Sequence, residues 1–303
     1  MLGKKTGFIK NLAKKIKVKG VWSNHEPWKY KRLIRANDED EFTPLTPIGF
    51  FAIYVGDERQ RFLIPTHYLS HPLFKMLLEK AYNDENQKSR LVMPCSVPAF
   101  LEEARYQKLH ERADVPFDET RVDHQQALTE LWNLAYPNVT LTGLISEQWK
   151  EMGWQGVNPS TDFRSCGFIS LENLLFFAKT FPNAFRRLLL KQREKIATWE
   201  YPFAVAGVNV SFMLTQMLEL YQVKPRCRNC LNFVKILGED EEAFDVLYCI
   251  AFVLMDAQWL ATHASYMEFN DVLKSTRTQL EKELALDDIQ RIRDLPAYNL
   301  LHS

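Results

Sequence analysis

The sequence predicts a mainly α-helical protein, in which an all-α domain follows a small α+β unit. Short β-branched and aromatic runs, the signals of strands, fall largely between residues 48 and 95. From Asp123 onward, apolar residues recur at helical spacing as far as about Leu284. We therefore predict three segments: a basic arm at residues 1–40, the α+β unit at 41–104 and the helical domain at 105–303.

The α+β unit is predicted in the order strand, strand, helix, strand, helix. The runs GFFAIYV and RFLIP, on either side of GDERQ, predict a β-hairpin. SHPLFKMLLEKAY predicts a helix capped by Ser70, with Pro72 in its first turn. RLVMPC predicts a third strand, and SVPAFLEEARYQKL predicts a helix that begins near Ser96. Because the unit is small for an independent core, we expect it to be marginally stable on its own.

The helical domain contains three strong helical patterns. HQQALTELWNLAYP and LENLLFFAK each repeat apolar residues every three or four positions. EEAFDVLYCIAFVLMDAQWLATHA is apolar on nearly every face, which is typical of a central helix buried by its neighbours. Its longest apolar run, from Val246 to Met255, is too short to cross a bilayer.

Composition is typical of a globular protein. The 303 residues are 46% apolar and 25% charged, as in soluble domains. The N-terminus alternates lysines with single apolar residues, so we expect no secretory leader. Five scattered cysteines fit a reducing compartment better than a disulfide framework. We therefore expect a cytoplasmic protein that is neither secreted nor membrane-spanning.

The zero net charge of the chain hides a strong asymmetry. Residues 1–35 contain eleven lysines and arginines and one acid, Glu26, so the remaining residues carry a net charge of −10. In KKTGFIKNLAKKIKVKG the apolar residues share one helical face among lysines. Residues 4–35 are thus expected to attach peripherally to an anionic membrane, to dock in an acidic groove, or to form a solvated arm. No nucleic-acid partner is expected, because no recognition fold accompanies the lysines.

The stretch WKEMGWQGVNPSTDFRSCGFISL, from Trp149 to Leu171, is unusual between two helical patterns. A connection of this length is usually functional or disordered, and its aromatic content argues against disorder. Residue types alone favour a structural interpretation, in which Asp162 and Arg164 belong to a buried polar network.

Other candidate sites are weaker. CRNC at Cys227–Cys230 has the spacing of a metal knuckle, but no second cysteine pair or histidine cluster lies nearby, so we predict no metal site. His67 and His71 lack an acidic companion and are interpreted as surface residues. No P-loop or dinucleotide fingerprint occurs, so we predict no cofactor.

Residues 48–103 resemble the plant small auxin-up RNA (SAUR) family. The resemblance lies in GFFAIYVGDERQRFLIPTHYLSHPLFKMLLEKAY and LVMPCSVPAF. Between them, NDENQKS stands where the family has a segment like Glu-Phe-Gly-Phe. The resemblance implies a non-enzymatic regulator of auxin-driven growth that binds and inhibits a D-clade type 2C protein phosphatase.

Residues 105–301 resemble an ELMO (engulfment and cell motility) domain. The stretch from Trp149 to Leu171 is the signature of that family, and WEYPFAVAGVNVSFMLTQML, MDAQWLA and YMEFNDVLKSTRTQLEKELAL extend the match. One branch of the family accelerates GTP hydrolysis by Arf-type small GTPases through the arginine of this motif. The resemblance therefore implies that Arg164 is the catalytic residue and that an Arf-family small GTPase is the partner.

The same resemblance implies roles for other residues of the stretch. Asp162 would orient Arg164 or its loop, and Gln155 would contact the GTPase or the attacking water. The tryptophans would anchor the loop to the helices, and the glycines, Gly156 included, would permit turns that the proline restricts. Ser165 stands where glycine is common. The residues expected to contact the GTPase or to support the motif are Trp149, Gly153, Trp154, Gln155, Pro159, Asp162 and Gly167.

The two resemblances meet near residues 101–108. Typical ELMO domains carry more helical sequence before DHQQAL, whereas here the SAUR-like unit occupies that place. We therefore expect the domain to lack an N-terminal support helix. A merged gene model would also produce such a chain. The alternative function, from a different class, is a non-catalytic interaction protein that joins an ELMO scaffold to a phosphatase-binding growth regulator.

Overall fold

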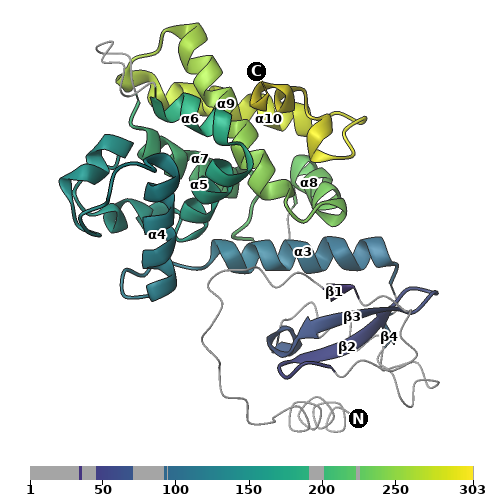
Figure 1. Cartoon of the computed structure of the whole chain (residues 1–303). Coiled ribbons are helices and arrows are strands. Elements are labelled where there is room, and N and C mark those ends of the chain that lie inside the picture. The colour runs from purple at the N-terminus through teal and green to yellow at the C-terminus, as the bar shows by residue number, and fades with distance from the viewer. Residues whose placement is uncertain are drawn as a thin grey trace. The chain divides into compact units, whose positions relative to one another are not determined.

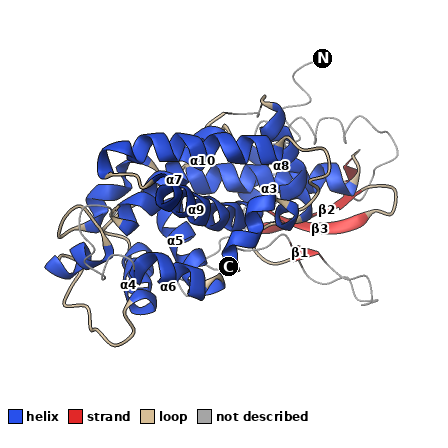
Figure 2. Ribbon diagram, turned by 90° about the horizontal axis from the view of Figure 1, so that it is seen from above, coloured by secondary structure: helices blue, strands red, loops and turns tan. Residues whose placement is uncertain are grey.

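The computed structural model describes residues 34–35, 46–70, 92–93, 95–190, 201–222 and 226–302. The chain forms two compact units, Met1–Phe100 and Leu101–Ser303 (Figure 1). It is mainly helical, as predicted, and its strands belong to the first unit (Figure 2). Apart from Ile34 and Arg35, the basic arm lies outside the described residues, and so does the helix predicted after Ser70.

The first unit holds a four-stranded sheet in the order β1-β3-β2-β4. Strands β2 and β3 pair antiparallel along their whole length, which confirms the predicted hairpin, and β4 pairs parallel with β2. Alternate residues of β2 are buried, as the period of a half-buried strand requires. A 3₁₀ helix, η1 (Thr66–Ser70), follows the hairpin. The strands are β1 Ile34–Arg35, β2 Phe50–Val55, β3 Gln60–Pro65 and β4 Val92–Met93.

Helix α3, Val97–Ala113, continues from the first unit into the second. In the first unit, Phe100 packs against Phe62 with 5.0 Å between the ring centroids. In the second unit, Nη1 of Arg105 donates a hydrogen bond to the carbonyl oxygen of Gly238 at 2.6 Å. The helical domain therefore has an N-terminal support helix, and the expectation that it lacks one was wrong. No helix-breaking residue follows the predicted segment, so the helix extends through His110–Ala113.

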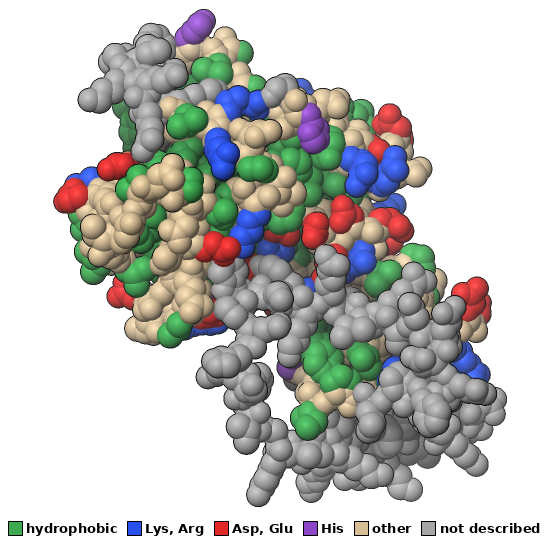
Figure 3. All heavy atoms as spheres, in the orientation of Figure 1, with side chains coloured by type: hydrophobic (Ala, Val, Ile, Leu, Met, Phe, Trp, Pro, Cys, Tyr) green, Lys and Arg blue, Asp and Glu red, His purple; other side chains and the backbone are tan. Residues whose placement is uncertain are grey.

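The second unit is built from helices joined by 3₁₀ turns. The three predicted helical patterns correspond to α4, α5 and α9. On the face shown in Figure 3, charged and apolar side chains are interspersed over this unit. Its α-helices after α3 are α4 Val122–Ala135, α5 Ile169–Thr180, α6 Pro182–Leu190, α7 Phe203–Met217, α8 Arg228–Glu239, α9 Ala243–Thr262 and α10 Phe269–Leu284. Its 3₁₀ helices are η2 Glu147–Met152, η3 Pro159–Ser165, η4 Tyr266–Glu268, η5 Ile292–Asp294 and η6 Pro296–Leu301.

Helix α9 forms the core of the second unit. Every residue from Ala243 to Asp256 is buried, and α5, α7 and α10 pack around the helix (Figure 2). Among the described helices, α9 alone is long and apolar enough to cross a membrane, but 83% of its apolar window is buried inside the fold. Its neighbours therefore cover its apolar surface, as predicted for a central helix.

Candidate functional site

The loop between α4 and α5 is held by buried aromatic side chains. Trp149 and Trp154 lie in η2 and just after it, and both are buried. The Trp149 indole meets Trp132 of α4 edge to face, with centroids 5.3 Å apart, and its Nε1 donates to the carbonyl oxygen of Leu144 at 3.2 Å. Trp154 packs against Phe163 of η3 at 5.1 Å. The first contact fixes η2 to helix α4, and the second joins η3 to the turn after η2.

Two glycines of the loop occupy conformations that other residues rarely adopt. Gly153 ends η2 with φ 86°, and Gly167, after η3, has φ 68°. Both values lie in the left-handed region that favours glycine. Gly156 has open space around it and is not among the residues with positive φ. The turn at Gly156 thus does not depend on glycine, contrary to the expectation from the sequence.

Helix η3 carries the arginine of the motif. Pro159 stands in its first turn and is buried, and the Asn158 side chain caps the helix by accepting from the backbone nitrogen of Ser160 at 3.0 Å. Proline and an asparagine cap are typical of a helix start. Phe163 is buried on one side of Arg164, and Cys166 is buried beyond it. Arg164 therefore projects from a turn whose neighbours are fixed.

Arg164 is exposed, so the interpretation that places it in a buried polar network was wrong. Within the described part of the chain, no hydrogen bond or ion pair holds its guanidinium. The carboxylate of Asp162 instead accepts a hydrogen bond from the backbone nitrogen of Gln155 at 3.0 Å. Burial raises the pKa of Asp162, against the opposing effects of the Gln155 N–H and of the Arg164 charge. Asp162 thus ties η3 to the turn after η2, while the Gln155 side chain is exposed.

A surface pocket of about 280 Å³ lies beside Arg164. Its walls are the segment that links α3 to α4, residues of η3 with the turn that follows, and Tyr221. Burial raises the pKa of the Cys166 thiol in this wall to about 12, which makes it a structural thiol rather than a nucleophile. The pocket is therefore a place where a partner side chain could pack next to the arginine.

The wall of the pocket and the residues packed against that wall include two residues that sequence reasoning missed. Phe117 stacks on Phe163 at 4.4 Å, and His124 stacks on Phe168 at 3.8 Å. His124 is fully buried, and its Nδ1 accepts from the backbone nitrogen of Asp118 at 3.0 Å. Burial lowers the pKa of His124, which favours the neutral ring. One signal could have found His124, because it lies one helical turn before Leu128, an apolar residue of the predicted helical pattern HQQALTELWNLAYP.

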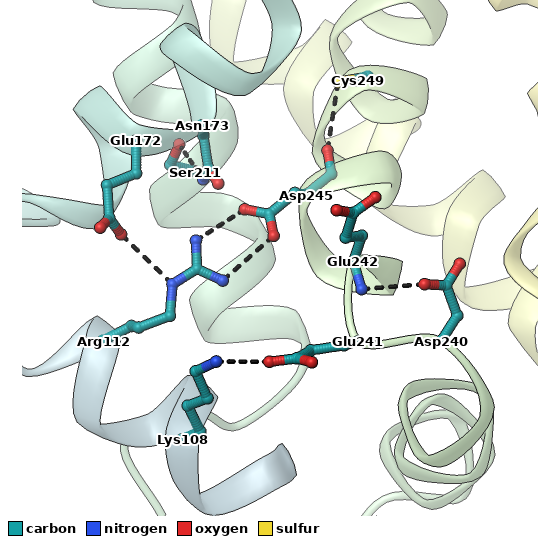
Figure 4. Close-up of polar contacts among 10 residues, drawn as sticks. All are labelled: Lys108, Arg112, Glu172, Asn173, Ser211, Asp240, Glu241, Glu242, Asp245 and Cys249. Carbon is teal, nitrogen blue, oxygen red and sulfur yellow. Dashed lines mark hydrogen bonds and ion pairs between the residues drawn. The ribbon is translucent and has the colours of Figure 1, made fainter. Parts of the chain in front are cut away.

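Helix α3 is joined to the core by buried charged side chains (Figure 4). The Arg112 guanidinium donates to both carboxylate oxygens of Asp245 in α9, at 2.7 and 3.2 Å. It also donates to Glu172 of α5 at 3.3 Å. Lys108, one turn earlier, pairs with Glu241. At most 13% of each side chain in the Arg112–Glu172–Asp245 cluster is exposed, so little solvent screens these charges.

The segment just after α3 also contacts the loop that carries Arg164. The carbonyl oxygen of Val115, just beyond the helix, accepts from the backbone nitrogen of Phe168 at 2.9 Å. Phe168 directly follows Gly167 and lies against His124. The position of η3 is therefore set by α3 as well as by the tryptophans.

The remaining candidates lie away from Arg164 in the sequence. The structure joins Cys227 and Cys230 by a disulfide, which the sequence analysis did not predict. A Glu219 carboxylate oxygen lies within 4.8 Å of both sulfurs, but a disulfide sulfur is not the thiolate that a metal requires. His67 is exposed in η1, just after the hairpin, and His71 lies outside the described residues.

Comparison with known proteins assigns the two segments of the chain. The sequence model of the ELMO/CED-12 family matches residues 107–273, and that of the family described as auxin responsive protein matches residues 9–109. ELMO domain-containing protein A of Dictyostelium discoideum is 30% identical over 67% of this chain and 23% of its own length. ELMO domain-containing protein B of the same organism is 27% identical over 64% of this chain and 65% of its own length.

A human relative, ELMO domain-containing protein 2, is 26% identical over 70% of this chain and 71% of its own length. The chain spans less than two thirds of the length of each of the two Dictyostelium relatives. The roles in GTP hydrolysis of Arg164 and its neighbours stay predictions. Because the ELMO/CED-12 model matches more than half of the sequence, this chain belongs to the ELMO/CED-12 family, with an auxin-responsive (SAUR-type) segment ahead of its helical domain.

Proposed function

We propose that the helical domain accelerates GTP hydrolysis by an Arf-family small GTPase and supplies Arg164 in trans. The single observation that carries the proposal is the exposed Arg164 guanidinium, which is held on a fixed turn and bonded to no described residue. A structural arginine would be paired inside the fold, as Arg112 is. Membership in the ELMO/CED-12 family supports the same interpretation.

The chemistry requires positive charge where negative charge develops on the γ-phosphate. A guanidinium supplied in trans accelerates hydrolysis roughly 10³- to 10⁵-fold, which corresponds to about 4–7 kcal/mol. Arginine suits the task because its planar fork of donors stays charged at every relevant pH. In this domain the buried Phe163 and Cys166 fix the backbone on both sides of Arg164, while the side chain is free to reach outward. The pocket beside Arg164 would receive a side chain of the GTPase that lies close to the bound nucleotide.

Single-turnover hydrolysis by a panel of GTP-loaded Arf-type GTPases tests the proposal. The full chain should raise the rate constant of at least one GTPase, and the rise should saturate with the concentration of the chain. If every GTPase of the panel binds the chain and none hydrolyses faster, the domain is a non-catalytic scaffold. That result would favour the alternative function over the proposed one.

The match to the auxin-responsive family supports a second role for the first unit. We propose that this unit binds a D-clade type 2C protein phosphatase, with the sheet of β2 and β3 as its folded framework. Full-length protein and a variant without residues 1–100 should differ in capturing the purified phosphatase. Equal capture by both would assign the binding to the helical domain and reject this role.

Peripheral membrane attachment through residues 4–35 is a further part of the proposal. Each lysine near an anionic surface contributes about 1 kcal/mol, and the attraction falls off within a Debye length as salt rises. Co-sedimentation with anionic liposomes should therefore be lost at high salt. Equal binding to neutral liposomes would contradict an electrostatic attachment.

A further inference from the structure

We propose that Cys227 and Cys230 form a reversible thiol–disulfide exchange site, whose reaction partners are low-molecular-weight thiols and disulfides such as glutathione. The pair stands at the start of α8, where Cys227 is the cap residue and Cys230 lies in the first turn. In the structure the two sulfurs are bonded. The proposal concerns this pair alone and does not depend on GTP hydrolysis.

The position of the bond argues against a purely structural role. The two cysteines are three residues apart on one helical turn, with 5.2 Å between their Cα atoms. A disulfide stabilises a fold mainly by restricting the unfolded chain, and the restriction grows with the length of the closed loop. A bond that closes so short a loop joins residues that α8 already holds together. Opening it should therefore leave the fold intact.

The two sulfurs differ in access, which gives the exchange a direction. Cys227 is partly exposed, whereas Cys230 is fully buried. The Cys230 sulfur lies 3.5 Å from the carbonyl oxygen of Met217, on the inner side of the helix. A small thiolate can therefore approach the Cys227 sulfur, and the Cys230 sulfur is the leaving group.

The surroundings of Cys227 favour its thiolate once the bond is open. Its sulfur accepts from the backbone nitrogen of Cys230 at 3.1 Å, and the start of a helix stabilises negative charge. The nearby Glu219 carboxylate opposes a second negative charge, but it already accepts from the backbone nitrogens of Arg226 at 2.7 Å and Cys227 at 3.4 Å. A stabilised thiolate makes a disulfide easier to reduce. By contrast, burial raises the pKa of Cys95, Cys166 and Cys249.

The proposed exchange is balanced in two steps. A thiolate RS⁻ attacks the Cys227 sulfur, the bond to Cys230 breaks, and the Cys230 sulfur leaves and takes up a proton. A second thiolate attacks the RS sulfur of the mixed disulfide, releases Cys227 and forms RSSR. In sum, the protein disulfide and two RSH give the protein dithiol and RSSR. Oxidation by RSSR is the reverse, so the site needs no other oxidant.

Equilibration of the full chain with mixtures of reduced and oxidised glutathione tests the proposal. A chelator excludes metal binding, and acid quenching with alkylation in denaturant followed by peptide mass analysis reports each cysteine. The fraction of the pair in the disulfide form should depend on the ratio of reduced to oxidised glutathione, with the same curve in the reducing and the oxidising direction. The near-ultraviolet circular dichroism should stay native throughout. Cys95, which is also partly buried, is the internal reference and should not follow that curve.

Two variants locate the reacting sulfur. Cys230→Ser should accumulate one glutathione adduct, on Cys227, and Cys227→Ser should accumulate none on Cys230. The proposal is overturned if the wild-type bond stays closed at every glutathione ratio until denaturant is added, because the bond is then structural. It is also overturned if the pair stays reduced in oxidised glutathione, or if the adduct forms on Cys230. The wild-type titration decides the question even where a variant fails to fold.

Discussion

A Cβ atom built on Gly167 would stand 2.4 Å from the carbonyl oxygen of Val115. The same oxygen accepts the backbone N–H of Phe168 at 2.9 Å. The turn after Arg164 therefore lies directly against the end of α3, at a distance that only glycine permits. Together with φ 68° at Gly167, this contact leaves no room for a side chain at this position of the turn.

Gly167→Ala should destabilise the domain by about 2–4 kcal/mol, because a left-handed alanine is strained and the close contact must open. GTPase activation should fall further than the loss of folded protein explains, since the turn carries Arg164. Thermal melting and hydrolysis measured on one preparation check both effects. Gly156→Ala is the matched control, because nothing lies within 4 Å of its Cβ position. Equal melting temperatures for the two variants would contradict the described packing.

Arg112→Ala should cost about 3–5 kcal/mol of unfolding free energy, because it leaves the buried Asp245 without its main partner. The double variant Arg112→Met with Asp245→Leu should recover part of the loss, since it removes both charges of that pair and leaves only Glu172 of the cluster charged. Arg228→Ala is the control: its pair with Asp287 is exposed and should contribute less than about 1 kcal/mol. Urea unfolding measures all three, and a loss at Arg112 no larger than at Arg228 would show that the cluster does not anchor α3.

His124 should make stability depend on pH on the acidic side of neutrality. Burial lowers its pKa in the folded state, while an unfolded histidine titrates near about 6.5. As pH falls, the His124 side chain is therefore protonated in the unfolded chain before it is protonated in the folded protein. The contribution of neutral His124 to the free energy of unfolding is fully present above the unfolded pKa and is lost as pH falls toward the folded pKa. His124→Asn, which keeps an acceptor for the Asp118 N–H, should melt lower at pH 8 but show a shallower slope below pH 6.5. Parallel slopes for variant and wild type would rule out this contribution.

Asp162→Asn should be tolerated at neutral pH and should keep the acceptor for the Gln155 N–H. Burial raises the pKa of Asp162 in the folded state. At pH values above this folded pKa, the ionised carboxylate lowers the free energy of unfolding. At pH values below the pKa of Asp162 in the unfolded chain, both states are protonated and this loss of stability disappears. The variant should therefore melt at least as high as wild type at pH 7, with the difference vanishing in acid. A lower melting temperature at pH 7 would mean that the carboxylate charge itself holds the loop.

Local patterns predicted the elements whose burial depends on their own spacing. The hairpin of β2 and β3, and helices α4, α5 and α9, follow from period-2 or helical recurrence within a single segment. Three features depend on contacts between distant residues and could not be predicted in this way. The anchoring of α3 rests on Arg112 meeting Asp245, the stacking of His124 rests on Phe168, and the position of Gly167 rests on Val115. The exposure of Arg164 could not be predicted either, because residue types do not show which arginine forms an ion pair inside the fold.

Arg164→Lys and Arg164→Ala, compared with Arg186→Ala, test the central claim most directly. Arg186 is an exposed arginine on α6 and serves as the control. Because Arg164 and Arg186 are exposed, all three variants should have the melting temperature of the wild type. Lysine cannot reproduce the planar fork of donors, so both Arg164 variants should lose most of an activation that is on the order of 10³-fold or more, while Arg186→Ala retains it. The measurement is single-turnover GTP hydrolysis by the responding Arf-type GTPase. Activation retained by Arg164→Ala, or lost only in proportion to unfolded protein, would contradict the account.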